Sequence, residues 1–558
     1  MNLDSSVRRA KIVATLGPAS NTKEMITSLI RAGLDIARVN MSHGFQDDHA
    51  KTIKTIREVS KELGREIGIL VDLQGPKIRV SKLKENLILE DNSEWELGHE
   101  SLGKIEHFIP TTYKDLVSDA RVGARILFDD GIIQSTVIEK NTDTIKIKVK
   151  VGGTLKSNKG INLPDCEVSA PSLTEKDYSD LLFALRQDID FIALSFVRTA
   201  DDIKTVKNML HGLKVRVPIV SKIEKPEAIE NIDSIIEVSD VIMIARGDMG
   251  VELGNHLVPS IQKNLIKKCN LQGVPVITAT QMLESMIENS TPTRAEASDV
   301  ANAIWDGSDA VMLSGETAAG KYPLMALETM DQIVKEAEKT PRVRPRLRDT
   351  VISSVSSANQ VAASMIAEKT NARWILSLTQ RGNSCLKMSR YRPKTGVLGV
   401  TTSLRTLRRM NLYWGITPFY VDMTNRNMDG LDSRALDKLK KEHKLINGDK
   451  IVLTYGDGNT FKEGTSNSIR VEVIKDLRKA NVSEHRFERV EFEKGSISLD
   501  LDVCAYCQSC ISVCSYDVWE VDQNNETKIN VKNAQNCILD NQCIDVCPTG
   551  AIEIIPKN

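Results

Sequence analysis

Short apolar, β-branched segments recur along the N-terminal part of this chain, and their number limits the folds open to it. Amphipathic helical stretches such as TKEMITSLIRAG lie between most of them. Continuous apolar strands that alternate with helices indicate a parallel sheet buried on both faces. Eight such units specify a (β/α)8 barrel, or TIM barrel. The eight predicted strand segments begin at Lys11, Ile36, Gly68, Asp190, Pro218, Val241, Pro275 and Ala310.

The alternation breaks between the third and fourth strands, where more than 100 residues intervene. Patterns such as TIKIKVKV, with apolar residues at every second position, indicate β-strands in this insertion. We therefore predict an inserted β-barrel lid domain over residues 80–171, within a barrel formed by residues 1–79 and 172–341. Loops at the strand ends build the active site of such barrels, so the lid is expected to cover it.

Strands and helices alternate again over residues 342–476, which predicts a C-terminal open α/β domain. The polar stretch over residues 477–499 is expected to run as a linker, with pairing as a sheet edge as the alternative. The last residues, 500–558, carry nine acidic residues against three lysines, a local net charge of −6. They form a separate acidic unit of a chain that is otherwise α/β in class.

Composition and charge exclude several classes of protein. Hydrophobic residues make up 41% of the 558 residues and charged residues 27%, as in ordinary globular proteins. The net charge of −1 gives no electrostatic support for binding nucleic acid or an anionic membrane. The apolar runs are far shorter than the roughly 20 residues of a membrane span, and the N-terminus lacks a signal-peptide core. We therefore expect a cytoplasmic protein.

Seven of the ten cysteines lie between Cys504 and Cys547. The first four have the spacing C-x2-C-x2-C-x3-C, in which three thiolates hold one Fe–S cluster and the fourth reaches a second cluster. Asp540 stands where the middle cysteine of the second half would be. A zinc site and a disulfide scaffold are the alternatives, and a cytoplasmic setting disfavours disulfides. Pseudo-symmetry assigns Cys504, Cys507, Cys510 and Cys547 to one cluster, and Cys514, Cys537, Cys543 and Asp540 to the other.

This cysteine pattern resembles the bacterial two-cluster ferredoxins, in which an aspartate at this position is known. The resemblance implies a small α+β ferredoxin-like domain over residues 500–558. A carboxylate is a harder ligand than a thiolate and holds iron less firmly. The cluster at Asp540 is therefore expected to be [4Fe-4S], or [3Fe-4S] after loss of one iron.

Polar side chains follow the predicted barrel strands, where the mouth of the barrel should lie. Carboxylates are hard oxygen ligands for Mg²⁺, and cations can surround a moving phosphoryl group, so this set favours metal-assisted phosphoryl transfer. The pattern does not identify the substrate. The residues are Arg38, Asn40, Ser42, His43, Asp72, Lys222, Glu224, Asp248 and Thr280.

Seven ordered motifs over roughly residues 9–475 resemble those of the pyruvate kinase family. They are RVNMSHG, DLQGPKIR, NKGINLP, SKIEKPEAIENI, MIARGDMGVE, TATQMLESMI and the long segment from PTRAEASD to AAGKYP. The resemblance implies phosphoenolpyruvate, ADP, ATP and pyruvate as ligands, Mg²⁺ or Mn²⁺ as the metal, and a homotetramer. It also implies that Glu224 and Asp248 bind the metal, while Lys222 and Arg38 contact the transferring phosphoryl group.

The resemblance assigns further residues of the site. The groups expected to hold the pyruvate carboxylate are the main chain of Arg246, Gly247 and Asp248 and the hydroxyl of Thr280. Thr280 and Ser314 are expected to lie on the relay that protonates the enolate. The residues expected to face the nucleotide are Asn40, His43, Arg79 and Lys159.

Lys77 departs from the family pattern in the third-strand motif, where glutamate is usual. The resemblance implies that members with glutamate need K⁺, whereas the tethered ammonium of a lysine replaces the free monovalent charge. We therefore expect activity without added K⁺. The monovalent site that Lys77 would replace comprises Asn40, Ser42, Asp72 and the carbonyl of Leu73.

A loop of the third domain, with Thr379, Arg381 and Ser384, resembles the phosphate-effector site of the family, together with a second loop over residues 456–468. Backbone amides and hydroxyls suit a phosphate. Arg381 and Asn383 differ from the common form, so an ordinary solvated loop is an equal alternative.

Three hypotheses for the whole chain stay open. In the first, oxidation of a cluster changes the contacts of the acidic module and regulates the kinase. In the second, the module is an electron carrier or docking arm for a basic redox partner. In the third, the chain is a catalytically silent redox or metabolite sensor, or a docking protein, built on the kinase fold. The intact set of Arg38, Lys222, Glu224, Asp248 and Thr280 argues against the third.

Overall fold

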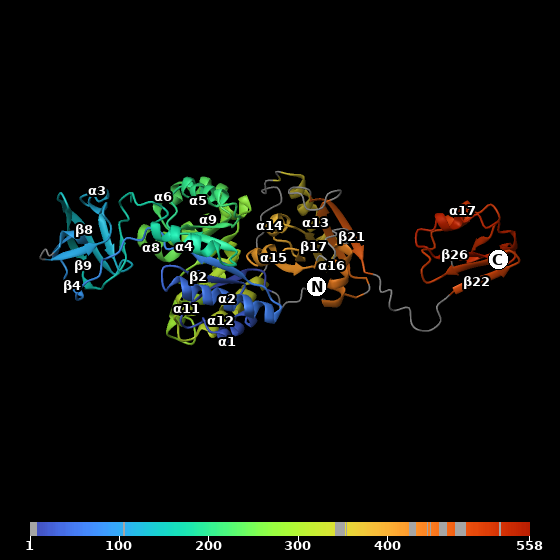
Figure 1. The fold of residues 1–558 in the computed structure, drawn as a ribbon, viewed down its shortest axis with the longest axis horizontal. Helices are drawn as coiled ribbons and strands as arrows, with labels where there is room; N and C mark the ends of the chain where they lie inside the picture. Colours follow the sequence, from blue (N-terminus) through green and yellow to red (C-terminus); the bar gives the residue numbers. More distant parts are fainter. Residues whose placement is uncertain are drawn as a thin grey trace. The chain divides into compact units, whose positions relative to one another are not determined.

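The computed structural model describes residues 8–103, 107–340, 352, 354–422, 431–442, 445–446, 448–456, 466–474, 487–523 and 526–557. The chain forms two compact units (Figure 1). The first covers residues 1–445 and 449–472, and the second covers residues 446–448 and 473–558. Across the described residues, every helix is too short or too polar to cross a membrane.

The first unit contains the predicted closed barrel of eight parallel strands. Alternate strand residues divide between two apolar clusters. Ile12 packs with helix residues such as Leu29, whereas its neighbour Val13 packs with residues from the other seven strands, such as Phe191. The interior is therefore a filled core and not a pore. The strands are β1 (Lys11–Leu16), β2 (Ile36–Asn40), β3 (Gly68–Asp72), β12 (Phe191–Leu194), β13 (Ile219–Ile223), β14 (Val241–Ala245), β15 (Val276–Ala279) and β16 (Ala310–Leu313).

Helices follow the barrel strands and bury their apolar faces on them. Capping boxes start two of these helices, with Thr174 and Asp177 at one N-terminus and Thr293 and Glu296 at the other. The helices are α1 (Lys23–Arg31), α2 (Gln46–Leu63), α4 (Glu175–Leu185), α5 (Ala200–Gly212), α6 (Pro226–Glu230), α7 (Ile232–Val238), α8 (Arg246–Leu253), α9 (Val258–Gln272), α10 (Arg294–Asp306), α11 (Gly315–Ala318) and α12 (Pro323–Lys339).

The insertion between β3 and β12 forms the predicted β lid domain, which has the form of a half-barrel. Its main sheet has the order β11-β7-β8-β9-β5-β6, and β10 pairs with β4. Arg79 and Val80 form isolated bridges with Gly160, next to β11, and with Thr111 of β6. Apolar residues such as Phe128 and Ile147 still form one buried cluster. The elements are β4 (Leu87–Leu89), β5 (Glu94–His99), β6 (Phe108–Thr111), α3 (Leu116–Asp119), β7 (Arg125–Phe128), β8 (Ile133–Lys140), β9 (Thr144–Val151), β10 (Gly153–Leu155) and β11 (Ile161–Asn162).

The third domain is the expected α/β domain, with the sheet order β19-β18-β17-β20-β21. The first four of these strands pair in parallel. The described elements are α13 (Val355–Thr370), β17 (Trp374–Leu378), α14 (Asn383–Arg390), β18 (Gly396–Thr401), α15 (Leu404–Met410), β19 (Ile416–Tyr420), α16 (Leu431–Glu442), β20 (Lys450–Gly456) and β21 (Ser466–Val473).

The second unit has a three-stranded antiparallel sheet and a two-stranded sheet. The described part of residues 477–499 follows the alternative expectation of a sheet edge, because Phe487–Phe492 and Gly495–Asp500 form the hairpin β22–β23, which pairs with β26. Alternate residues of β22, such as Val490 and Phe492, pack on the core of the unit, and this burial outweighs the charge of Glu491 between them. The other elements are α17 (Ser509–Val513), β24 (Trp519–Val521), β25 (Thr527–Ile529), α18 (Gln542–Asp545) and β26 (Ile552–Pro556).

Candidate active site and cysteine-lined cavities

A buried network of charges lies at the carboxyl ends of β2, β3 and β13. Nε and Nη2 of Arg38 each lie 2.7 Å from Asp72 Oδ2. Lys222 Nζ lies 3.5 Å from Asp72 Oδ1 and 3.0 Å from Glu224 Oε1. Asp72 and Glu224 are fully buried. The closed barrel therefore brings Lys222 and Glu224 close to Arg38, which is 184 and 186 positions earlier in the sequence, as expected of a barrel mouth.

The network fixes the charge of its members. Burial alone would raise the pKa of Asp72, but Lys222 and Arg38 hold that pKa below its usual range. Burial lowers the pKa of Lys222, yet Asp72 and Glu224 more than offset this effect and hold it above its usual value. Asp72 is therefore a carboxylate and Lys222 an ammonium at neutral pH.

Glu224 is the member of this network with free capacity to bind a cation. Its Oε2 accepts a hydrogen bond of 2.7 Å from the backbone N–H of Phe196. Its Oε1 is buried without a well-directed hydrogen bond. Burial, which Lys222 offsets only in part and Asp248 reinforces, raises the pKa of Glu224. A divalent cation beside Oε1 would supply the missing partner, so the residues fit Mg²⁺.

Asp248, in the first turn of α8, contacts Lys77. Lys77 Nζ lies 3.0 Å from Asp248 Oδ1 and 3.6 Å from Asp130 Oδ1 at the tip of the lid. Burial lowers the pKa of Lys77, but Asp248 and Asp130 outweigh it and raise that pKa. The lysine that sequence comparison singled out therefore bridges the lid and a carboxylate expected to bind the metal.

Most of the oxygens expected to bind a monovalent cation already accept hydrogen bonds from donors of the protein. Asn40 Oδ1 accepts from the backbone N–H of Ser42 at 3.2 Å. The carbonyl of Leu73 accepts from Ser195 Oγ at 2.8 Å. Asp72 is held by Arg38 and Lys222, as described above. Ser195 was not among the predicted site residues.

Thr280 follows β15 with a positive φ of 68°. Its hydroxyl accepts from the backbone N–H of Gly247 at 2.7 Å and donates to the carbonyl of Ala279 at 2.6 Å. The Arg246 guanidinium donates to the carbonyl of Thr280 at 2.7 Å and to Asp299 at 2.7 Å. The side chain of Arg246 thus supports the turn that carries Thr280.

Ser314 follows β16, and its hydroxyl oxygen is buried without a hydrogen-bond partner among the described residues. Its backbone N–H donates to Glu316 Oε2 at 2.7 Å, and Glu316 Oε1 accepts from the backbone N–H of Leu283 at 3.1 Å. Glu316 is fully buried. This carboxylate, which holds the turn that carries Ser314, was not among the predicted site residues.

Three of the residues expected to face the nucleotide come from the loop after β2, from the start of the insertion and from the lid. Burial, then Arg79 and Arg38, lower the pKa of His43, so its imidazole is neutral at physiological pH. Arg79 Nη1 donates to the carbonyl of Asn158 at 2.9 Å. Lys159 Nζ lies 2.7 Å from Asp129 Oδ1. Both cations are therefore held by the lid itself.

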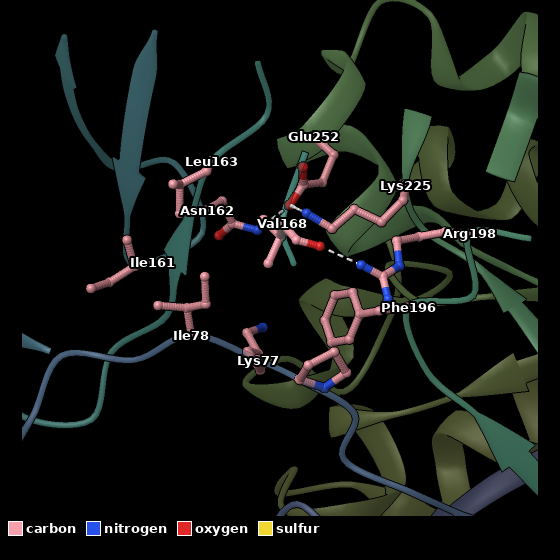
Figure 2. A pocket seen from close by; sticks show the side chains of 11 residues that line it. Lys77, Ile78, Ile161, Asn162, Leu163, Val168, Phe196, Arg198, Lys225 and Glu252 are labelled. Atoms are coloured by element: carbon pink, nitrogen blue, oxygen red, sulfur yellow. Dashed lines mark hydrogen bonds and ion pairs between the residues drawn. The ribbon is translucent and has the colours of Figure 1, made fainter. Parts of the chain in front are cut away.

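A cleft lies where the lid meets the barrel, and Figure 2 shows the side chains that line it. Glu252 Oε1 accepts from Asn162 Nδ2 of the lid and from Lys225 Nζ of the barrel, each at 2.8 Å. Arg198 donates to the carbonyl of Val168, another lid residue (Figure 2). These contacts join the lid to the barrel beside Lys77, and their residues were not among the predicted site residues.

The expected effector loop follows β17. Thr379 is buried, and its hydroxyl accepts from the backbone N–H of Gly382 at 3.0 Å. Gly382 has φ +88°, a conformation that suits glycine. Arg381 is exposed and Ser384 is half-buried. Most of the second expected loop, residues 457–465, lies outside the described residues.

The cysteines of the second unit line two cavities that divide them as pseudo-symmetry predicts. Cys504, Cys507, Cys510 and Cys547 line one cavity. The other cavity is lined by Cys514, Cys537, Cys543 and Asp540.

The backbone around the two cavities repeats. Tyr506 and Gln508 have positive φ angles of 51° and 61°, at the second and fourth positions after Cys504. Leu539 and Asn541 have φ angles of 63° and 60°, at the same positions after Cys537. Asp540 therefore occupies the same place in its loop as Cys507 does in the other, and both residues are exposed.

The cavities fit a cluster better than a single ion. Among the described residues, no three His, Cys, Asp or Glu side chains converge closely enough to hold one metal ion. Structural zinc needs such convergence, with four ligands around one ion, whereas each cysteine of a cubane binds a different iron. Backbone N–H groups also donate to the thiols, from Tyr506 to Cys504 at 3.4 Å and from Ala551 to Cys547 at 3.3 Å.

Models of known protein families match both units of this chain. Residues 7–327 match the family model for the pyruvate kinase barrel domain, and residues 358–472 match the model for its alpha/beta domain. Residues 531–553 match a 4Fe-4S binding domain. The pyruvate kinases of Staphylococcus epidermidis, Staphylococcus haemolyticus and Staphylococcus aureus are each 42% identical to this chain, over 476, 477 and 483 residues.

Each of these alignments covers 84% of this chain and 81% of the relative. The barrel model alone spans more than half of the 558 residues. The closed barrel with its charged mouth, the half-barrel lid and the C-terminal α/β sheet agree with these matches. The chain therefore belongs to the pyruvate kinase family, and it carries a 4Fe-4S binding domain in its C-terminal part.

Proposed function

We propose that this pyruvate kinase transfers the phosphoryl group of phosphoenolpyruvate to ADP, which gives pyruvate and ATP. The observation that carries the proposal is the position of Lys222, whose ammonium lies between the buried carboxylates Asp72 and Glu224. A fixed cation in a buried site stabilises negative charge on a moving phosphoryl group without reorganisation.

In the proposed mechanism, Glu224 and Asp248 hold Mg²⁺ or Mn²⁺. The metal, when bound, polarises the phosphoryl and carboxylate oxygens of the substrate. Lys77, which contacts Asp248, would then have to give up part of that contact. Arg38 and Lys222 contact the phosphoryl oxygens.

The phosphoryl transfer breaks the bond between the enol oxygen and phosphorus and forms a new bond to a terminal oxygen of ADP. His43, Arg79 and Lys159 orient the ADP phosphates, and Asn40 lies beside them. Thr280 holds the carboxylate together with the main chain of Gly247 and Asp248. The enolate takes up one proton at its methylene carbon through a relay that includes Thr280 and Ser314, whose buried hydroxyl has free capacity.

We also propose that the enzyme needs no K⁺. Two observations support this: Lys77 brings an ammonium to the metal-side carboxylate, and protein donors already serve Asn40, Asp72 and the carbonyl of Leu73. The test is a kinase assay in which tetramethylammonium is the only monovalent cation. A strict requirement for K⁺ would exclude the proposal.

For the second unit, we propose two Fe–S clusters with the ligands assigned above. The cavities support a four-thiolate site and a site with three thiolates and Asp540. We favour an electron-carrier or docking role over regulation of the kinase, because the unit has its own core and its residues 500–558 carry a net charge of −6, which suits a basic partner.

The other expectations from the resemblance stay proposals as well. They are a homotetramer in the cytoplasm and a phosphorylated effector at Thr379, Arg381 and Ser384. The turn at Gly382, which points a backbone N–H at Thr379, supports a loop rich in donors.

One preparation tests both halves of the proposed function. Protein purified without oxygen is examined by electron paramagnetic resonance and assayed for pyruvate production with lactate dehydrogenase. We expect a brown protein with Fe–S signals and Mg²⁺-dependent activity. Removal of residues 487–558 should leave the turnover unchanged if the module only carries electrons, and should change it if the module regulates the kinase.

A further inference from the structure

Ser195 has contacts that go beyond the residues assigned to the reaction. It follows β12 directly and is 1% exposed. Its hydroxyl lies 2.7 Å from Lys222 Nζ, closer than either carboxylate of the network. It also lies 2.8 Å from the carbonyl of Leu73 and 3.4 Å from Asp72 Oδ1.

The direction of these hydrogen bonds follows from the chemistry of the groups. A carbonyl oxygen only accepts, so the single hydroxyl proton of Ser195 goes to Leu73. The oxygen of Ser195 then accepts from Lys222, which as an ammonium only donates. The hydroxyl thereby holds the ammonium on the β3 side of the mouth, next to the end of β12.

The backbone around Ser195 is shaped for this contact. Phe196 has a positive φ of 54°, uncommon for a bulky residue, and its N–H donates to Glu224. Gly75 packs against this turn with φ +72°, and a Cβ there would lie 2.8 Å from the Cβ of Ser195. The turn over Ser195 and Phe196 thus holds both Lys222 and Glu224, and Gly75 leaves room for it.

We propose that Ser195 is a positioning residue for phosphoryl transfer, whose hydroxyl sets the place of the Lys222 ammonium relative to Asp72 and Glu224. This inference rests on the proposed function. Ser195 does not touch the substrate in this proposal and acts through Lys222. Misplacement of that ammonium should slow the transfer. The affinity for ADP should stay the same, because other residues bind the nucleotide.

The test uses full-length protein with three substitutions. Ser195→Ala removes the hydroxyl, Ser195→Cys keeps the size but offers only a weak donor and acceptor, and Ser195→Thr keeps the hydroxyl. We expect kcat to fall about 10- to 100-fold in the alanine and cysteine variants, because a small misplacement of a catalytic group costs that much. KM for ADP should stay within about twofold, since the nucleotide contacts are intact. Ser195→Thr should recover most of the rate.

A partial reaction separates positioning from damage to the fold. Exchange of the methyl protons of pyruvate with deuterium, followed by nuclear magnetic resonance with Mg²⁺ present, needs no phosphoryl transfer. It should therefore continue near the wild-type rate in the alanine and cysteine variants. Ser308→Ala is the matched control, because it removes another fully buried hydroxyl, one that bonds Thr278. It should leave both reactions unchanged.

Three outcomes would overturn the proposal. The first is wild-type kcat in the cysteine variant, which also decides the matter if the alanine variant fails to fold. The second is loss of proton exchange by the same factor as kcat, which would indicate general damage. The third is failure of Ser195→Thr, correctly folded by circular dichroism, to recover any rate. If the wild type itself makes no ATP from phosphoenolpyruvate, the proposed function fails first, and this assay shows that separately.

Discussion

The barrel mouth and the cysteine module both gather ligands for inorganic cofactors, but they do so in opposite ways. At the mouth, Asp72 already lies between Arg38 and Lys222, and Asp248 already holds Lys77. In the module, cysteines line two cavities and make up part of a small core, with Cys510, Cys537 and Cys543 among its buried residues.

This difference indicates what holds each site in place. The mouth belongs to a large closed barrel, which positions its charges whether or not a metal is bound. The module is a small unit whose buried core includes some of its own cysteines, so metal bound at these cysteines adds directly to its folding free energy. The mouth should therefore keep its shape without Mg²⁺, whereas the module should depend on its clusters.

The largest expected effect is on catalysis at the mouth. In Lys222→Met, kcat should fall by about 10³-fold, because the fixed cation beside the phosphoryl group is lost. The lactate dehydrogenase assay measures it. Lys225→Met is the control, since it removes a buried ammonium that pairs with Glu252 and not with the network. A Lys222→Met enzyme within tenfold of the wild type would mean that the mouth is not organised around this lysine.

The second prediction removes iron with a chelator under reducing conditions. Amide protection over residues 487–557, measured by hydrogen exchange and mass spectrometry, should fall by more than about 100-fold as the module opens. Protection of the barrel strands should not change. Cys510→Ser should weaken the module in the same way. Cys385→Ser replaces a buried thiol of the third domain and should leave the brown colour of the protein intact. Unchanged amide protection of the module after removal of iron would contradict the conclusion that the module depends on its clusters.

The third prediction concerns the monovalent charge at the mouth. Lys77→Glu removes the ammonium from Asp248 and adds a negative charge, so the variant should gain roughly tenfold activation by K⁺. The wild type should respond by less than about twofold under the same conditions. Lys140→Glu makes the same charge change at the end of β8 and should gain no activation. Equal activation of the wild type and Lys77→Glu by K⁺ would show that Lys77 does not replace the monovalent cation.

The fourth prediction compares the two cavities of the module. Asp540→Cys should slow the loss of iron from the second cluster in air by roughly tenfold, because a thiolate holds iron more firmly than a carboxylate. Cys507→Asp, at the matching position of the other loop, should make the first cluster labile. Electron paramagnetic resonance distinguishes the [3Fe-4S] product from the intact cluster. The ligand assignment is wrong if these two substitutions do not change the rate of iron loss from their clusters in opposite directions.

Much of this molecule could be predicted because its signals are local. The eight barrel strands are continuous apolar runs, and the cluster ligands follow a fixed spacing. The hairpin over residues 487–500 was harder to predict, because charged residues alternate with its apolar ones and its partner β26 lies more than 50 residues later.

The sequence determined the barrel, the order of its motifs and the spacing of its cysteines, because periodicity and residue type act over short stretches of chain. The tertiary structure alone decided which donor meets each carboxylate. Ser195 reaches Lys222 and Leu73 only because β12 lies between β3 and β13 in the closed barrel. Lys77 likewise meets Asp248 only because the half-barrel and the barrel mouth come together there. Such contacts join residues far apart in sequence, and packing sets them rather than local pattern.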